Sequence, residues 1–481
     1  MTDSYDQVAY PGFPFPESHP DRLCIIGRLL GMEPAPAARC RVLELGCGDG
    51  GNLIPMALAL PESDFVGIDL AAQPVARGCA IAAELGLRNI RLTRMDVRDF
   101  PADAGPFDYI IAYGLYSWIP EDARRQVLAI AGAQLRPQGI AYVNYNVFPG
   151  CHARLMLREM MLAHTRTAES PADRIELARQ FLAAFPDSPA LTAAARRLLD
   201  RAPAALFHDE LDEFYHPLYF RDFIREAAAH GLQYLAEATL SDTHAAAEDA
   251  AIADLIEREQ HLDYLMNRAF RQTLLCRAEV VLDHCLRTSP IASLWAASPA
   301  TSSSADGGQT EFRTEHSVLG TAHPAAIAVL NALIEAWPRA VPAAELPGDP
   351  QQVEAILLSA FAGGLVRLYA TPPALAAVPA ERPVASPLAR IQGRTDETIT
   401  TLLHTSVEVS DPIVRRLLVL LDGTRDRAAL VDELLPLVGG SRETLAPALD
   451  RNLAAFARLG LLATPPADRS PHTPASPHRA R

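Results

Sequence analysis

The stretch Val42–Asn52, VLELGCGDGGN, decides the fold. It joins a short run of β-favouring apolar residues to a turn that contains Gly46, Gly48 and Gly50, and a helix-favouring run follows. Glycine lets the main chain bend sharply and lets a ligand approach it closely, while the first turn of the next helix presents free N–H groups. The stretch therefore predicts a small-molecule binding turn between a strand and a helix.

Similar apolar runs recur up to residue 146, and helical patterns separate them. Strands that alternate with helices predict right-handed crossovers and a mainly parallel sheet, so the fold class is α/β. The expected strands are CRVLELG, DFVGIDL, NIRLTRMD, FDYIIAYG and GIAYVNYN. The expected helices run from Asn52 to Leu60, from Gln73 to Gly86, and from Pro120 to Leu135, with Pro120 in the first turn.

The glycine spacing alone leaves two kinds of ligand open. Gly46, Gly48 and Gly51 satisfy the dinucleotide pattern G-x-G-x-x-G, and Asp69 ends the second strand, where a ribose-binding acid belongs. Three features favour a different donor. Glu44 lies two residues before the first glycine, Asp96 ends the third strand, and some 40 residues precede the first strand.

Together these features resemble the class I methyltransferases, whose fold is a seven-stranded Rossmann-like sheet. The resemblance implies S-adenosyl-L-methionine as cofactor: the glycine loop would hold its methionine part, Asp69 its ribose and Asp96 its adenine. An arm that carries Tyr10 and His19 would close over the donor. The candidate cofactor-binding residues are Tyr10, Glu44, Gly46, Cys47, Gly48, Asn52, Asp69, Leu70, Asp96, Val97 and Tyr113. Alternatively, Asp69 and Asp96 only cap the helices that follow them.

Aromatic residues follow the fourth strand, where such enzymes place acceptor-site residues. Tyr113, Tyr116 and Trp118 offer ring faces that can hold a cation or a methylated ammonium group. Asn146, at the end of the fifth strand, adds a polar group. The candidate catalytic residues are Tyr116, Trp118 and Asn146. The alternative is that the rings pack a helix on the sheet and that Asn146 only ends a strand.

Under this resemblance the SAM-binding methyltransferase core spans residues 42–150, and the rest of the chain divides into further parts. Residues 151–206 predict a helical insertion, and 207–295 supply two more strands that complete the sheet, with a polar helix from His244 to Arg268 between them. The segment 296–312 predicts a polar linker that buries nothing, and a Pro-rich linker lies near 371–387. Winged-helix-like α+β domains are expected at 312–370 and 388–464, an N-terminal arm and helix at 1–41, and a disordered tail at 465–481.

A narrower resemblance covers most of the chain. The stretches YPGFPFPESHPDRL, LELGCGDGGNL, YGLYSWIP, VNYNVFPG and NRAFRQTLLC resemble bacterial methyltransferases that carry a methyltransferase regulatory domain, including the protein lysine methyltransferases of rickettsiae. The resemblance implies N-methylation of lysine in a protein substrate and a homodimer. Methylation of a small molecule or of a peptide natural product stays open, as does a binding protein with a vestigial donor site.

Composition excludes several classes of function. A net charge of −15 disfavours nucleic acid as a partner, since it repels phosphate groups. No apolar run reaches the roughly 18 residues that membrane insertion needs, and no secretory signal begins the chain, so we expect a cytoplasmic protein. Its seven cysteines have no zinc spacing, which predicts reduced thiols and no metal. All 43 basic residues are arginine.

Overall fold

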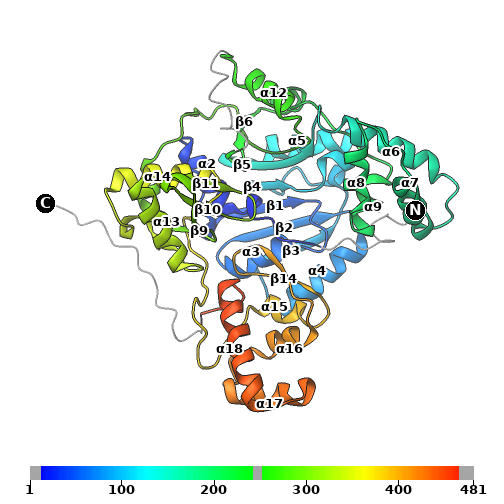
Figure 1. Ribbon diagram of the computed structural model, residues 1–481. Helices are drawn as coiled ribbons and strands as arrows, with labels where there is room; N and C mark the ends of the chain where they lie inside the picture. Colours follow the sequence, from blue (N-terminus) through cyan, green and yellow to red (C-terminus); the bar gives the residue numbers. More distant parts are fainter. Residues whose placement is uncertain (1–11, 242–251, 465–481) are drawn as a thin grey trace. The chain divides into compact units, whose positions relative to one another are not determined.

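The computed structural model describes residues 12–241 and 252–464 (Figure 1). It divides into two compact units, which are described separately. The first unit comprises residues 1–334 and 341–371, and the second comprises 335–340 and 372–481. The expected part of the polar helix near His244, the residue Tyr10 and the C-terminal tail lie outside the described residues.

The first unit is built on a seven-stranded sheet with the order β3-β2-β1-β4-β5-β7-β6. Neighbouring strands are parallel except that β7 runs antiparallel to both β5 and β6. This confirms the α/β class I methyltransferase fold predicted from the sequence. The strands are β1 Arg41–Leu45, β2 Asp64–Asp69, β3 Ile90–Arg94, β4 Phe107–Ala112, β5 Leu135–Asn146, β6 Leu232–Glu237 and β7 Phe270–Arg277.

Helices cover this sheet and bury its apolar residues. Side chains of β4, β5, α5 and α10 form one continuous core that is shielded from water. Pro120 precedes α5 as its N-cap instead of lying in its first turn, because its ψ of 161° is still extended. The helices are α2 Pro20–Leu29, α3 Leu53–Ala59, α4 Ala72–Glu84, α5 Glu121–Gln134, α10 Phe220–Ala228 and α12 Leu255–Met266.

The predicted helical insertion has its own small core. Leu157, Met161, Leu182, Leu198 and Leu206 are among the apolar side chains that its helices bury against one another. Its helices are α6 His152–His164, α7 Pro171–Ala183, α8 Thr192–Leu199 and α9 Pro203–Glu210. The insertion therefore packs as a small helical bundle that follows β5.

The two ends of the insertion are tied to each other. Val147, just after β5, forms a parallel bridge with Leu218. The Phe148 amide donates to the Leu218 carbonyl at 3.0 Å, and the Leu218 amide donates to the Asn146 carbonyl at 3.1 Å. The chain therefore leaves the sheet and returns to it at one point.

The prediction of a polar linker at 296–312 is wrong. This segment contains three strands, and Ala296 and Ala297 are completely buried in β8 between β12 and β13. Alanine side chains fit there because they are small and apolar, and the Ser298 hydroxyl donates to the Leu365 carbonyl at 2.7 Å. The elements are β8 Trp295–Ala297, β9 Thr301–Ser304, β10 Thr310–Arg313, β11 Val318–Thr321, α13 Pro324–Ala336, β12 Val341–Pro342, α14 Pro350–Ala362 and β13 Arg367–Tyr369.

The second unit is a small helical domain with a two-stranded sheet. Near its C-terminal end the chain forms isolated bridges, in which Ala463 pairs with Leu375 and Leu462 pairs with Ala385. Part of the Pro-rich segment thus packs into this unit. Its elements are α15 Pro387–Gln392, β14 Thr398–Thr400, β15 Ser406–Glu408, α16 Pro412–Leu420, α17 Arg427–Val438 and α18 Arg442–Arg458.

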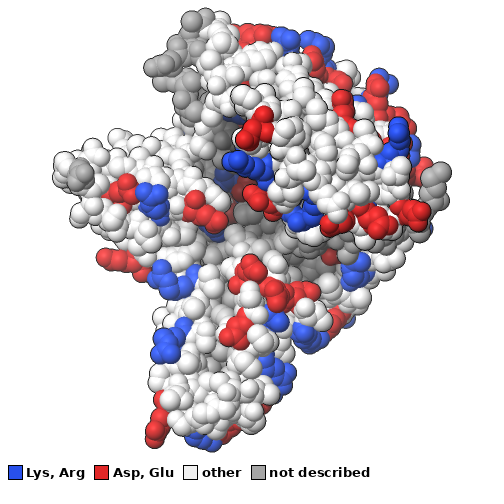
Figure 2. Space-filling model, turned by 45° about the vertical axis from the view of Figure 1, so that its right-hand side comes forward, with Lys and Arg blue, Asp and Glu red and all other residues white. Residues whose placement is uncertain are grey.

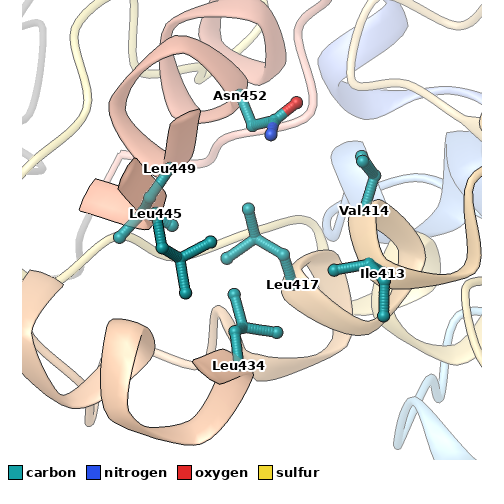
Figure 3. Close-up of a pocket in the computed structure, with 7 residues that line it drawn as sticks. All are labelled: Ile413, Val414, Leu417, Leu434, Leu445, Leu449 and Asn452. Carbon is teal, nitrogen blue, oxygen red and sulfur yellow. The ribbon is translucent and has the colours of Figure 1, made fainter. Parts of the chain in front are cut away.

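A cavity of about 30 Å³ lies among α16, α17 and α18. Figure 3 shows that its lining is apolar apart from the amide of Asn452. This volume is enough for a water molecule but not for an organic ligand. We therefore regard the cavity as a packing feature of the second unit.

Within residues 12–241 and 252–464, no helix has both the length and the apolar character needed to cross a membrane.

Candidate functional site

The glycine loop lies at the carboxyl ends of β1 and β2, and Asp69 holds it there. The Gly48 amide donates to Asp69 Oδ2 and the Ala71 amide donates to Asp69 Oδ1, both at 2.8 Å. The Gly46 amide donates to the Ile68 carbonyl, also at 2.8 Å. One carboxylate therefore orders both the loop after β1 and the turn after β2. Asp69 does not cap the helix that follows it, because the N-cap of α4 is Ala71.

Two glycines make the loop possible. Gly48 has a φ of +55°, a conformation that other residues rarely adopt, and no atom lies within 4 Å of the place where a Cβ would stand. Gly78, in the middle of α4, lets that helix approach the loop closely, because a Cβ there would lie 2.2 Å from the Asp49 carbonyl oxygen. The space beside Gly48 is open to a ligand, and Gly78 fixes the opposite side of the loop.

Glu44 is a buried carboxylate with one unused oxygen. Its side chain is 2% exposed, and Asn52 Nδ2 donates to its Oε1 at 2.8 Å. Its Oε2 has no hydrogen-bond partner among the described residues. Burial raises the pKa of Glu44 to about 8, although the Asn52 amide opposes this shift. A cationic group bound here would supply the missing partner and favour the ionised form.

The N-terminal arm packs against this loop. The Phe15 amide donates to Asn52 Oδ1 at 3.0 Å, and the Phe15 ring stacks on Tyr113 with 3.4 Å between the ring centroids. A Cβ on Gly51 would lie 2.5 Å from the Gly12 carbonyl carbon, so the third glycine of the dinucleotide pattern accommodates the arm. His19 caps α2, where its Nδ1 accepts from the Asp21 amide.

Asp96 is placed as the capping alternative describes. It is the N-cap of the short helix Val97–Asp99, and its carboxylate accepts from the Arg98 amide at 2.9 Å. The Arg98 guanidinium also binds Asp96 at 2.6 Å and Asp122 at 3.0 Å. The hydrogen bond from Arg98 lowers the pKa of Asp96, so this carboxylate is ionised. A contact with adenine would compete with Arg98.

The candidate acceptor residues Tyr116 and Trp118 differ in how far they are buried. Tyr116 is completely buried, its ring packs against Tyr145 and Phe223, and its hydroxyl donates to Glu226 at 2.9 Å. The structure therefore places Tyr116 as the packing alternative describes, enclosed by core rings. Trp118, in the same short helix Tyr116–Trp118, is only half-buried.

Asn146 and Trp118 belong to one hydrogen-bonded corner. The main-chain N–H of Asn146 donates to the Ser117 hydroxyl at 2.8 Å, which ties the end of β5 to the segment after β4. Asn144, two residues earlier, accepts from the Gly114 amide at 2.7 Å. The corner is thus fixed at the carboxyl ends of the two strands that follow the donor loop in the sheet.

Comparisons with known proteins support the family suggested by the sequence. Residues 42–139 match the model of a methyltransferase domain, 202–277 that of a predicted methyltransferase regulatory domain, and 381–455 that of a PKMT C-terminal winged helix domain. Uncharacterized protein RP028 of Rickettsia prowazekii is 31% identical over 47% of this chain and 93% of its own length. The chain belongs to the class I methyltransferases with a methyltransferase regulatory domain.

A second relative is longer than this methyltransferase. Uncharacterized protein RP789 of Rickettsia prowazekii is 33% identical over 60% of this chain, and the chain spans 55% of that relative. A solved structure, PKMT2 from Rickettsia typhi in complex with AdoHcy, has a TM-score of 0.83 at 24% identity and matches 94% of this chain and 99% of its own. That likeness shows the same fold over nearly the whole molecule.

The methyltransferase loop fits the donor of this class, S-adenosylmethionine. The open space at Gly48 suits close approach of a ligand, and the unpaired oxygen of Glu44 suits a cationic amino group. The bound donor would supply a methyl group on a positively charged sulfur. Phe15 and Gly78 were not predicted as site residues. Phe15 lies in the Pro-rich stretch YPGFPFPESHPDRL, whereas a single glycine within a helix carries no signal of its own.

Proposed function

We propose that the chain transfers the methyl group of S-adenosylmethionine to lysine side chains of a protein. The observation that carries the proposal is a pair of carboxyl groups at the glycine loop. Asp69 accepts from the amide of Gly48, beside which the space is open, and Glu44 is buried with one oxygen that has no partner among the described residues. In this proposal Asp69 contacts the ribose hydroxyls, Glu44 faces the donor's amino group, and Leu70, Asp96 and Val97 border the adenine.

Two observations support a protein lysine as the acceptor. The C-terminal domain matches the winged helix domain of the PKMT family, and the half-buried Trp118 ring lies in the same corner as Asn146. An aromatic face stabilises an ammonium group by roughly 0.5 to 2 kcal/mol. Trp118 can therefore hold the lysine ammonium group, which has to lose a proton before its nitrogen attacks the methyl carbon of the donor and the carbon–sulfur bond breaks.

The charge pattern supports a protein partner over a nucleic acid. On the face drawn in Figure 2, acidic and basic side chains are interspersed, and uncharged surface separates them. A nucleic-acid site needs basic groups gathered on one face. Together with the net charge of −15, this pattern favours a protein substrate, which is recognised by contacts at one small part of the surface, over a nucleic acid.

The test uses tritiated S-adenosylmethionine with two acceptor preparations, total bacterial lysate protein and a protein-free metabolite extract. We expect label in lysate protein, released on acid hydrolysis as methyllysine. Because the chain contains no lysine, methyllysine in the digest cannot come from the enzyme's own side chains. Label found only in the metabolite extract would replace the proposal with small-molecule methylation. No donor binding in calorimetry would reject methyl transfer altogether.

The proposal includes a cytoplasmic homodimer that does not bind DNA. Light scattering of the purified chain should give about 104 kDa, twice the chain mass of 52.0 kDa. Retention on immobilised DNA at low salt should not exceed that of serum albumin. A mass of one chain would remove the dimer from the proposal.

A further inference from the structure

A buried ion pair joins the first and the last helix of the insertion. Arg154 of α6 binds Glu210 at the end of α9, with Nε 2.9 Å and 3.1 Å from the two carboxylate oxygens and Nη2 2.7 Å from Oε1. The Glu210 side chain is 0% exposed and that of Arg154 is 18% exposed. Such a two-point pair fixes the plane of the guanidinium as well as its position.

The same guanidinium touches both polar and aromatic parts of the acceptor corner. Its Nη1 donates to Asn146 Oδ1 at 3.2 Å, and its Cζ lies 5.3 Å from the ring centroid of Trp118. On another side, Cζ lies 4.9 Å from the ring of Tyr215, and the rings of Tyr215 and Trp118 are 5.0 Å apart. Arg154 is thus in contact with both acceptor residues that remain candidates.

The contact with Arg154 decides how the Asn146 amide is turned. A guanidinium carries only hydrogen-bond donors, so the amide oxygen must face it and the NH2 group must face away. Without Arg154 the amide could rotate and exchange its two ends. Arg154 therefore determines that Asn146 has its NH2 group left for a second partner.

We propose that Arg154, held by Glu210, is a positioning residue of the acceptor site that fixes the Asn146 amide and the Trp118 ring. The inference rests on the proposed methyl transfer. Glu210 and Tyr215 lie in the segment 202–277 that matches the regulatory-domain model, so this segment reaches the acceptor corner through Arg154. The fixed NH2 group of Asn146 would bind an oxygen of the substrate, such as a main-chain carbonyl.

Arg201 offers a matched control. Its Nη1 donates to Glu210 Oε1 at 3.0 Å and also pairs with Asp209, so it shares the partner of Arg154. It has no contact with Asn146 or Trp118 among the interactions that the structure gives for these described residues. A change at Arg201 therefore disturbs Glu210 without directly disturbing the acceptor corner.

The experiment compares Arg154→Lys with Arg201→Lys in the full chain. Lysine keeps the charge that Glu210 needs, but it cannot bind a carboxylate at two points and an amide at the same time. Each variant carries one lysine of its own, so the label is counted in lysate protein after the enzyme has been removed. At saturating tritiated donor and limiting lysate protein, the initial rate then reports kcat/KM for the acceptor. We expect Arg154→Lys to lower it at least tenfold and Arg201→Lys less than threefold, with unchanged donor affinity and similar melting temperatures.

A third variant, Asn146→Ala, distinguishes positioning from a general structural role. If Arg154 acts through Asn146, adding Arg154→Lys to Asn146→Ala should cost much less than tenfold, because the effects are not independent. Equal losses in Arg154→Lys and Arg201→Lys, or a full tenfold loss in both backgrounds, would overturn the inference. Absence of transfer by the wild-type chain would instead reject the proposed function.

Discussion

The donor half of the site, Glu44–Asn52 with Asp69, and the acceptor half, Trp118 and Asn146 with Arg154, Glu210 and Tyr215, are assembled differently. The donor half comes from one strand-loop-helix-strand unit, and its polar contacts join residues that lie close together in the sequence. The acceptor half joins the turns after β4 and β5 to the insertion and to the segment that follows it.

The difference shows which properties each half depends on. A contiguous unit folds its loop wherever the glycines and the neighbouring strand are present, so its binding chemistry is set locally. A corner made from distant segments depends on the packing of the insertion. The two halves should therefore respond separately to substitution, and four variants test this separation.

The largest expected effect is that of Asp69→Ala on donor binding. The change removes one hydrogen bond that orders the glycine loop, one that orders the turn after β2, and the proposed contact with ribose. Hydrogen bonds to a charged group contribute roughly 1.5 to 3 kcal/mol each. We expect the Kd for S-adenosylhomocysteine to rise at least 100-fold in calorimetry. Asp64→Ala, at the other end of the same strand, should leave it unchanged. Near wild-type affinity in Asp69→Ala would contradict this donor site.

The next effect is that of Gly78→Ala. A methyl group at this position meets main-chain atoms of Asp49, so either α4 or the loop must shift. Overpacking of this kind costs about 1 to 3 kcal/mol. We expect about a 30-fold weaker donor affinity and a lower melting temperature, whereas Ala80→Ser, an added atom on the exposed side of α4, should have neither effect. A variant with wild-type affinity would show that the loop is less rigid than the contact implies.

Glu44→Gln should have a smaller effect with a clear pH signature. The folded chain holds the Glu44 proton up to a pKa of about 8, whereas the unfolded chain releases it near 4.5, so wild-type stability falls as pH rises between these values. The variant lacks this loss. The difference between the melting temperature of the variant and that of the wild type should increase in the variant's favour from pH 5 to pH 8. The donor affinity of the variant should be about tenfold lower. Parallel pH curves for the two proteins would disprove the buried titration.

The smallest effect on the donor half is expected from Trp118→Phe. Phenylalanine keeps a ring but provides a weaker face for a cation. The donor Kd should stay within twofold of the wild type, while methyl transfer to lysate protein falls about fivefold. Trp295→Phe, in β8, should change neither quantity by more than twofold. A large loss of donor affinity in Trp118→Phe would show that the two halves are coupled.

The arrangement of the glycine loop beside Asp69 could be predicted from the sequence because its signals are local. The spacings between Glu44, the glycines and Asp69 depend only on consecutive elements of the chain, namely a strand, a turn, a helix and the next strand. The positions of Phe15 and Arg154 could not be predicted, since each depends on how a distant segment returns to the sheet. The error at 296–312 has a similar origin: small alanines look like linker residues until a neighbouring strand covers them.

The tie between Val147 and Leu218 has a consequence beyond this chain. The insertion leaves the sheet and returns to it at the bridge between Val147 and Leu218, and its helices have a core of their own. These helices can therefore be replaced as one segment without changing the order of the strands in the sheet. Grafting the corresponding segment from a relative would then carry over a substrate preference while the recipient keeps its methyl donor. The same exchange of the insertion helices is open to natural evolution.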